Sequence, residues 1–294
     1  MIDLDAIRLL ADIPAAQAAR QAAARAIRFE GRDTSYAELS ACSNRVANAL
    51  GGQGIGAGAR VALLSKNHDR WYPVFFGTAL ARACLAPVNS RLTASEINFI
   101  LGDAAPRLLF VGEDFFDVAL AAVAGLESPP RLVALSGDHP AFEPFDTWLG
   151  NACDAVPAER PQLSDPVLQL YTSGTTGLPK GVVLDNANYR TFLELASEVD
   201  GFAYGEGEPV MIVMPLFHVA GTNISFSALA QGAGIVLIKD FSAAEAIRII
   251  GAEGICHSFL APAMIQMMLQ DPAAGQGDYR SEEHTSNSSH DQRS

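Results

Sequence analysis

Residues 171–181 combine hydroxyl side chains, three glycines and one lysine in a pattern suited to binding a polyphosphate. Gly174 and Gly177 can adopt positive φ, which lets backbone N–H groups approach an anion closely. The hydroxyl groups can donate hydrogen bonds to phosphate oxygens, and Lys180 adds a mobile positive charge. Those hydroxyl groups belong to Thr172, Ser173, Thr175 and Thr176. We therefore predict that this segment binds phosphate groups.

The spacing of this segment differs from that of the P-loop motif. A P-loop has a glycine directly before its lysine, whereas Pro179 precedes Lys180 here. A plain polar turn between two strands is the simpler alternative, because glycine, threonine and proline are common in turns. The whole chain, however, has only three lysines, Lys66, Lys180 and Lys239, and one of them lies in this segment. We therefore favour a phosphate-binding segment of a type other than the P-loop.

Residues 171–184 resemble the phosphate-binding signature of the acyl-adenylate-forming superfamily. That family includes acyl-CoA synthetases, luciferases and the adenylation domains of peptide synthetases. The resemblance extends over most of the chain, because further segments match in the family's order: Tyr36–Leu39, Pro87–Leu92, Met214–His218 and Phe259–Pro262. The chain looks most like a fatty acyl-CoA synthetase. This resemblance implies that ATP activates a carboxylic acid to an acyl-adenylate, from which the acyl group passes to coenzyme A.

The resemblance also implies roles for single residues. The predicted ATP-binding set is Thr172, Ser173, Gly174, Thr175, Thr176, Gly177 and Lys180. Thr175 or Thr176 would place a Mg²⁺ ion that bridges the phosphates. Lys180 and His218 are the predicted catalytic residues, and His218 would lie between the acid pocket and the nucleotide. A histidine in an apolar segment can equally be a core residue, so that alternative stays open.

Other residues near these motifs have weaker assignments. Gly221 and Asn223 are expected beside the acid pocket. Arg91 either orients the phosphates or stabilises its own loop, and we favour the structural role. His257 is expected to pack in the core. Three further residues are candidates for lining the acid pocket, although such groups are more often core: Phe259, Pro262 and Met264.

Composition excludes several classes of protein. The 294 residues are 49% hydrophobic and carry a formal net charge of −13, with no basic cluster, which argues against a nucleic-acid-binding surface. The four cysteines are widely spaced and form no Cys-x-x-Cys pair, so neither a zinc site nor a disulfide framework is indicated. No apolar run reaches membrane-spanning length. We expect a cytoplasmic enzyme that binds a small-molecule acid, ATP and CoA, with a homodimer in the full-length parent.

Strands and helices are predicted to alternate along the chain, which favours an α/β fold with parallel or mixed sheets. The resemblance implies a layered αβαβα domain with two mixed sheets, incomplete at its C-terminal side. Capping boxes of the Ser/Thr-x-x-Glu type are predicted to start helices at Ser35, Thr93 and Ser242. Residues 136–165 read as a long connection. The predicted strands are 27–29, 60–64, 84–88, 107–111, 131–135, 167–171, 210–214, 234–239 and 255–260.

The last residues, 280–294, contain no apolar side chain and are predicted to be a disordered polar tail. The start of this tail resembles the translation of a sequencing adapter, so we expect a partial AMP-binding domain over 1–279 and a foreign tail after it. Later family elements, including a metal-binding glutamate and a C-terminal lysine, are then expected to be missing and the chain to be inactive. The alternatives are a non-catalytic nucleotide-binding module or an aryl- or amino-acid-adenylating relative.

Overall fold

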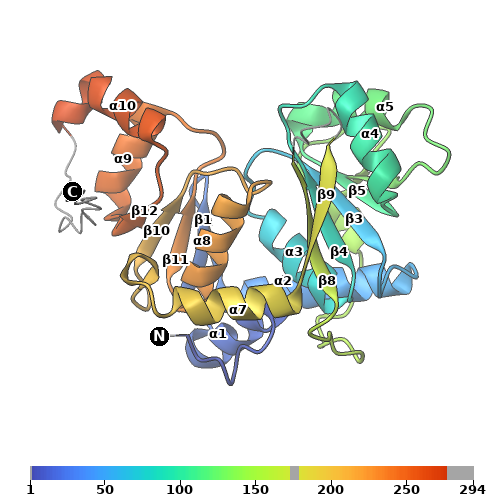
Figure 1. Ribbon diagram of the computed structural model, residues 1–294, viewed down its shortest axis with the longest axis horizontal. Coiled ribbons are helices and arrows are strands. Elements are labelled where there is room, and N and C mark those ends of the chain that lie inside the picture. Colours follow the sequence, from blue (N-terminus) through green and yellow to red (C-terminus); the bar gives the residue numbers. More distant parts are fainter. Residues whose placement is uncertain (1, 173–178, 277–294) are drawn as a thin grey trace, which may run out of the picture.

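A computed structural model describes residues 2–172 and 179–276 of the chain. Within this part, the strands form two sheets, which we call sheet A and sheet B. Figure 1 shows the two sheets in separate halves of the molecule, with helices between them and on their outer sides. The long helix α7 (Asn186–Ala196) runs across both halves in this view.

Sheet A is parallel except for one edge strand. In spatial order it contains β12 (His257–Ser258), β10 (Pro209–Ile212), β11 (Gly234–Leu237), β1 (Arg25–Phe29) and β2 (Arg32–Ser35). Strands β1 and β2 form a hairpin, with Phe29 opposite Arg32. Residues 255–260 were expected to form a full strand, but only two of them pair with β10, at the edge of the sheet.

Sheet B is also parallel except for its last strand. Its spatial order is β7 (Glu143–Pro144), β6 (Arg131–Ala134), β5 (Leu108–Val111), β3 (Arg60–Leu64), β4 (Cys84–Val88), β8 (Pro166–Thr172) and β9 (Lys180–Asp185). Strand β9 was not predicted as a strand. It pairs antiparallel with β8, and its residues Val182 and Val183 are largely exposed.

Successive residues of the central strands point to two different cores, as the two-residue period of a strand requires. In β3, Val61 and Leu63 face the core between the sheets, whereas Ala62 and Leu64 face the outer core of sheet B. In β11, Ile235 packs between the sheets and the following valine packs on the outer side of sheet A. Both faces of each sheet are therefore covered, which confirms the layered αβαβα fold.

Helices fill the three α layers. The core between the sheets includes residues of α1 (Ile13–Gln21), α2 (Tyr36–Gly52), α3 (Trp71–Leu80), α6 (Phe145–Leu149), α7 and α8 (Val219–Ala230). Helices α4 (Ala94–Ala104) and α5 (Phe116–Val123) cover the outer face of sheet B, and α9 (Ala243–Glu253) and α10 (Pro262–Gln270) cover that of sheet A. The 3₁₀ helices are η1 (Leu10–Asp12), η2 (Glu113–Phe115), η3 (Asp200–Phe202) and η4 (Pro272–Gln276).

Helix α3 is the centre of the middle layer, since all ten of its residues are buried. The Trp71 and Phe75 rings stack with centroids 5.3 Å apart, and Phe75 also contacts Phe226 of α8 at 4.5 Å. Helix α2 packs so closely on α3 that a Cβ on Gly77 would lie 2.5 Å from the Cβ of Val46. The middle layer is therefore densely packed where α2, α3 and α8 meet.

Two of the three predicted capping boxes form. Ser35 and Thr93 accept hydrogen bonds from the N–H groups of Glu38 and Glu96, whose side chains bond back to the caps. Helix α9 begins directly after Ser242, as predicted, but Ser242 makes no side-chain cap bond, so the predicted capping box does not form. The reason is a competing partner, because Glu245 binds Arg248 one turn later with N–O distances of 2.7 and 2.8 Å.

Candidate functional site

The predicted phosphate-binding segment connects the two strands of an antiparallel hairpin. Thr172 ends β8, Lys180 begins β9, and the two residues are partners in the register of the hairpin. Both are exposed. Side chains of paired residues lie on the same face of a sheet, so the threonine hydroxyl and the lysine ammonium share one side. The predicted residues Ser173, Gly174, Thr175, Thr176 and Gly177 lie outside the described residues.

A chain of polar side chains holds the base of this hairpin. Arg60 Nε donates to Gln169 Oε1 at 2.7 Å, and Gln169 Nε2 donates to the Tyr171 hydroxyl at 2.8 Å. The Tyr171 hydroxyl in turn donates to Asp103 Oδ2 of α4 at 2.5 Å. Burial and the neighbouring Asp103 carboxylate raise the pKa of Tyr171 well above its ordinary value, so the hydroxyl keeps its proton. The sequence did not predict this series of hydrogen bonds from Arg60 to Asp103.

Gly181 makes room for that polar chain. A Cβ at this position would lie 2.6 Å from Gln169 Nε2 and 3.1 Å from the Tyr171 ring. Gly181 pairs with Tyr171 in the hairpin register, directly beside the pair formed by Thr172 and Lys180. The glycine after the lysine therefore has a packing role in the part of the motif that the structure describes.

His218 lies at the N-cap position of α8 and is exposed. Its neighbour Phe217 contacts the imidazole, with ring centroids 4.6 Å apart. Partial burial of the ring and, to a lesser extent, the charge of Arg91 lower the pKa of His218 below its ordinary value. The imidazole is therefore kept neutral at pH 7 and has one nitrogen able to accept a proton.

Arg91 and Thr172 follow neighbouring parallel strands of sheet B. Strand β4 ends three residues before Arg91 and pairs with β8, which ends at Thr172. Ligands of open α/β sheets bind beyond the carboxyl ends of such strands. The charge of Arg91 also contributes to the lowered pKa of His218, which belongs to the segment after β10 of sheet A. Thr172 and Lys180 thus lie at one edge of sheet B, and Arg91 follows the strand next to β8.

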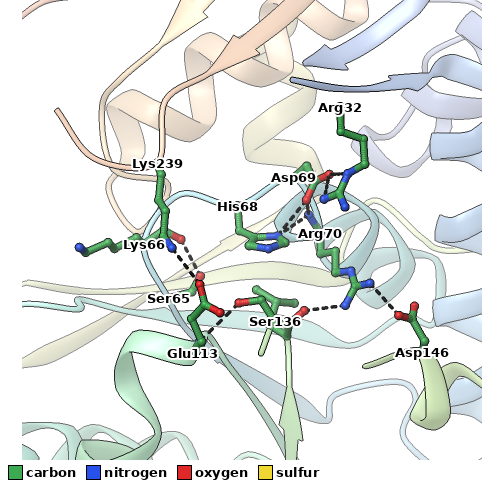
Figure 2. Close-up of polar contacts among 11 residues, drawn as sticks. Arg32, Ser65, Lys66, His68, Asp69, Arg70, Glu113, Ser136, Asp146 and Lys239 are labelled. Atoms are coloured by element: carbon green, nitrogen blue, oxygen red, sulfur yellow. Dashed lines mark hydrogen bonds and ion pairs between the residues drawn. The ribbon is translucent and has the colours of Figure 1, made fainter. Parts of the chain in front are cut away.

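The loops at the carboxyl ends of both sheets are joined by ion pairs, of which Figure 2 draws the one between Lys239 and Glu113. Lys239, after β11 of sheet A, lies 3.1 Å from Glu113, which follows β5 of sheet B. Lys66, after β3, lies 3.1 Å from Asp240. Two of the three lysines are therefore paired across the sheets, whereas Lys180 extends from the hairpin. No shared role of the three lysines is indicated.

Asp69 forms the most buried of these ion pairs. Its Oδ2 atom lies 2.6 Å from Arg32 Nη2 of β2, and His68 Nδ1 lies 2.9 Å from its other oxygen, as Figure 2 shows. Burial alone would raise the pKa of Asp69. The hydrogen bonds and charges of His68 and Arg32 outweigh burial, so the pKa lies below its ordinary value and the carboxylate stays ionised. This pair also connects sheet A to the loop after β3.

The residues with weaker assignments are placed in different surroundings. A Cβ on Gly221 would lie 2.5 Å from the Pro215 carbonyl oxygen, so this glycine lets α8 pack on the loop before it. The Asn223 Oδ1 atom is buried without a hydrogen-bond partner in the described part of the chain. His257 lies 3.2 Å from Glu208 and packs edge-on against Tyr204, in agreement with the predicted packing role.

An apolar groove of about 290 Å³ lies on the outer side of sheet A. It is lined by Ile250, Leu260, Ile265, Met268, Leu269 and Ala274. The three candidates for an acid pocket, Phe259, Pro262 and Met264, are not among these residues, and Phe259 is half exposed. In the described ranges, no helix has the length and apolar character needed to cross a membrane.

Comparisons with known proteins agree with this geometry. The family model described as AMP-binding enzyme matches residues 14–290. A fatty acid–[acyl-carrier-protein] ligase, ScoC of Streptomyces coeruleorubidus, is 38% identical over 86% of this chain and 48% of its own length. An indoleacetate–CoA ligase of Aromatoleum aromaticum is 34% identical over 84% of this chain and 48% of its own. The chain therefore spans about half the length of these curated relatives.

A solved structure shares the fold. It is that of a putative long-chain-fatty-acid CoA ligase from Rhodopseudomonas palustris, which superposes with a TM-score of 0.81 at 28% identity. The match covers 91% of this chain and 67% of the other. The overall fold described above is therefore shared with a protein of related sequence.

Proposed function

Because the chain belongs to the AMP-binding enzyme family, whose members include adenylate-forming acid–thiol ligases, we propose that it supplies the ATP-binding part of such a ligase. ATP, with its Mg²⁺ ion, reacts with a carboxylic acid to give an acyl-adenylate and pyrophosphate. The acyl group then passes to a thiol, either of coenzyme A or of a carrier protein. The matches cover only 48% of the length of these two relatives, so this activity is proposed for the whole enzyme.

The observation that carries the proposal is the pairing of Thr172 with Lys180 at the carboxyl edge of sheet B. A hydroxyl donor and an ammonium on one face, with a glycine-rich connection between them, suit the phosphates of ATP. We extend this binding set to Ser173, Gly174, Thr175, Thr176 and Gly177, and the Mg²⁺ role to Thr175 or Thr176. His218, uncharged at pH 7, is proposed to contact the acid, because the N–H of a neutral imidazole can donate a hydrogen bond to a carboxylate oxygen.

We propose a fatty acid as the substrate. The similarity to ScoC and to the Rhodopseudomonas palustris structure supports it, whereas the similarity to an indoleacetate–CoA ligase supports an aryl acid instead. Adenylation of either acid needs the same phosphate contacts, because the reacting groups are a carboxylate and the α-phosphorus in both cases. The identity of the acid substrate is therefore determined by an activity assay that compares medium-chain and long-chain fatty acids with indoleacetate.

Nucleotide binding and turnover are tested separately. Calorimetric titration of the chain with ATP and Mg²⁺ should give saturable binding, weakened about tenfold or more by Lys180→Ala, because a charge-assisted contact to phosphate is lost. Lys66→Ala is the matched control, since Lys66 is held in ion pairs with Asp240 and Asp114. Acid-dependent exchange of labelled pyrophosphate into ATP by the whole enzyme then identifies the acid. ATP affinity that is equal in wild type and Lys180→Ala would contradict the proposal.

A further inference from the structure

Asn67 connects the two halves of the molecule with a single buried side chain. It follows β3 of sheet B and is 5% exposed. Its amide nitrogen donates to the carbonyl oxygens of Ile238 at 3.0 Å and Met214 at 3.2 Å, both beyond strands of sheet A. Its amide oxygen accepts from the N–H of Leu216 at 2.9 Å. Both hydrogens of the amide nitrogen and one oxygen lone pair are therefore used.

These bonds hold the turn that leads to His218. Two of the three partners, Met214 and Leu216, lie on either side of Pro215, so the asparagine grips the turn from the sheet B half. Helix α8 contacts the same turn from the other side, through the close approach of Gly221 to the Pro215 carbonyl. That carbonyl also accepts from the His218 N–H at 3.1 Å. The position of His218 is thus determined by the turn.

The hydrogen bonds of Asn67 bear on the distance between the predicted site residues of the two halves. Thr172, Lys180 and Arg91 belong to sheet B, whereas His218 belongs to a segment that follows a strand of sheet A. The two groups need a fixed separation if one bound acid and one nucleotide are to meet between them. The ion pairs across the sheets are partly exposed and therefore fix this separation weakly. Asn67 is buried and makes its bonds at the base of the histidine turn itself.

We propose that Asn67 is a positioning residue that holds His218 in register with the phosphate-binding edge of sheet B. It makes no contact with substrate in this role and acts through the turn 214–216. The inference rests on the proposed function of His218 as the residue that contacts the acid. The alternative is a clamp that stabilises the fold as a whole, without a specific effect on His218.

The position of His218 is measured by nuclear magnetic resonance on the 294-residue chain, without ATP or acid. In wild type, burial and Arg91 lower the pKa of the imidazole. In Asn67→Ala the turn loses its two hydrogen bonds to Asn67, so the ring becomes more hydrated and its pKa should rise by about half a unit or more. The Leu216 N–H should also exchange faster with solvent, since its acceptor is gone. His139 and His257 serve as internal references.

Two further variants separate positioning from a loss of stability. Asn67→Leu keeps most of the side-chain volume but makes no hydrogen bond, and it should reproduce the His218 shift if Asn67→Ala folds poorly. Asn44→Ala is the matched control, because Asn44 is also a buried asparagine and donates to a distant backbone carbonyl, that of Asp154, at 2.9 Å. It should lower stability without moving the His218 pKa. An unchanged His218 pKa in both Asn67 variants, or an equal shift in Asn44→Ala, would overturn the inference.

Kinetics of the whole enzyme test the consequence for the reaction. Asn67→Ala should raise KM for the acid about tenfold while KM for ATP stays unchanged, and it should add little in a His218→Ala background. Equal and additive effects on both substrates would contradict a positioning role. Failure of the proposed function looks different, because pyrophosphate exchange would then be absent with every acid while the resonance shift of His218 remained.

Discussion

Thr172 and Lys180 are directly opposite each other in the hairpin of β8 and β9. The pair lies beside Tyr171 and Gly181, which are also partners and carry the polar chain to Asp103. The register of the hairpin therefore places two residue pairs with different roles next to each other. The outer pair presents donors to solvent, and the inner pair connects the hairpin to the body of sheet B. Substitutions at the two pairs are expected to have different consequences.

Lys180→Ala should leave the stability of the fold unchanged. The side chain is exposed, and exposed surface substitutions usually change the free energy of unfolding by no more than about 0.5 kcal/mol. Urea denaturation followed by circular dichroism measures this change. A loss of several kcal/mol would mean that any weaker ATP binding of the variant reflects a damaged fold.

Gly181→Ala should be destabilising, by about 1–3 kcal/mol, because its Cβ would collide with Gln169 and Tyr171. Gly51→Ala is the control, since nothing lies within 4 Å of a Cβ at that helical position. The control should be neutral or up to about 1 kcal/mol more stable, as alanine favours a helix. The denaturation midpoints of the two variants measure this difference in stability. Equal midpoints would disprove the predicted collision.

Asp69→Asn should lower the free energy of unfolding by about 2 kcal/mol at pH 7, because Arg32 and His68 lose a charged partner. The pKa of Asp69 is lower in the folded state than its ordinary value of 3.8. Its contribution is therefore complete above that ordinary value and is lost as the pH falls through the folded pKa. Denaturation of both proteins from about pH 7 to pH 3 should show the difference between them shrinking. A constant difference would contradict this assignment.

Lys239→Ala should have a small effect that depends on salt. Partial burial alone would lower the pKa of Lys239, but Glu113 and Asp114 reverse this and raise it. The pair with Glu113 is partly exposed, so its loss should cost about 0.5–1 kcal/mol at low ionic strength and less in 1 M salt. Asn67→Ala, which removes buried hydrogen bonds, should cost more and show no such salt dependence. Thermal melts at two ionic strengths compare the variants.

Much of the fold and part of the site are encoded locally. The capping boxes at Ser35 and Thr93 form as predicted, because each involves residues within one helical turn. The buried strands at 60–64 and 84–88 were recognised from their apolar runs. The box at Ser242 failed because Arg248, one turn further on, competes for Glu245. Strand β9 was missed although Val182 and Val183 are β-branched, since the motif around Lys180 was interpreted as a loop.

The amino-acid sequence by itself determined the chemistry of the segment 171–181, through its hydroxyl groups, glycines and lysine, and it determined the alternation of strands and helices. Only the tertiary structure decided which side chains meet. Asn67 binds Met214 and Ile238, which are 147 and 171 residues away in the chain. Local periodicity carries no information about such contacts, because they depend on how two separately formed sheets pack on the helices between them.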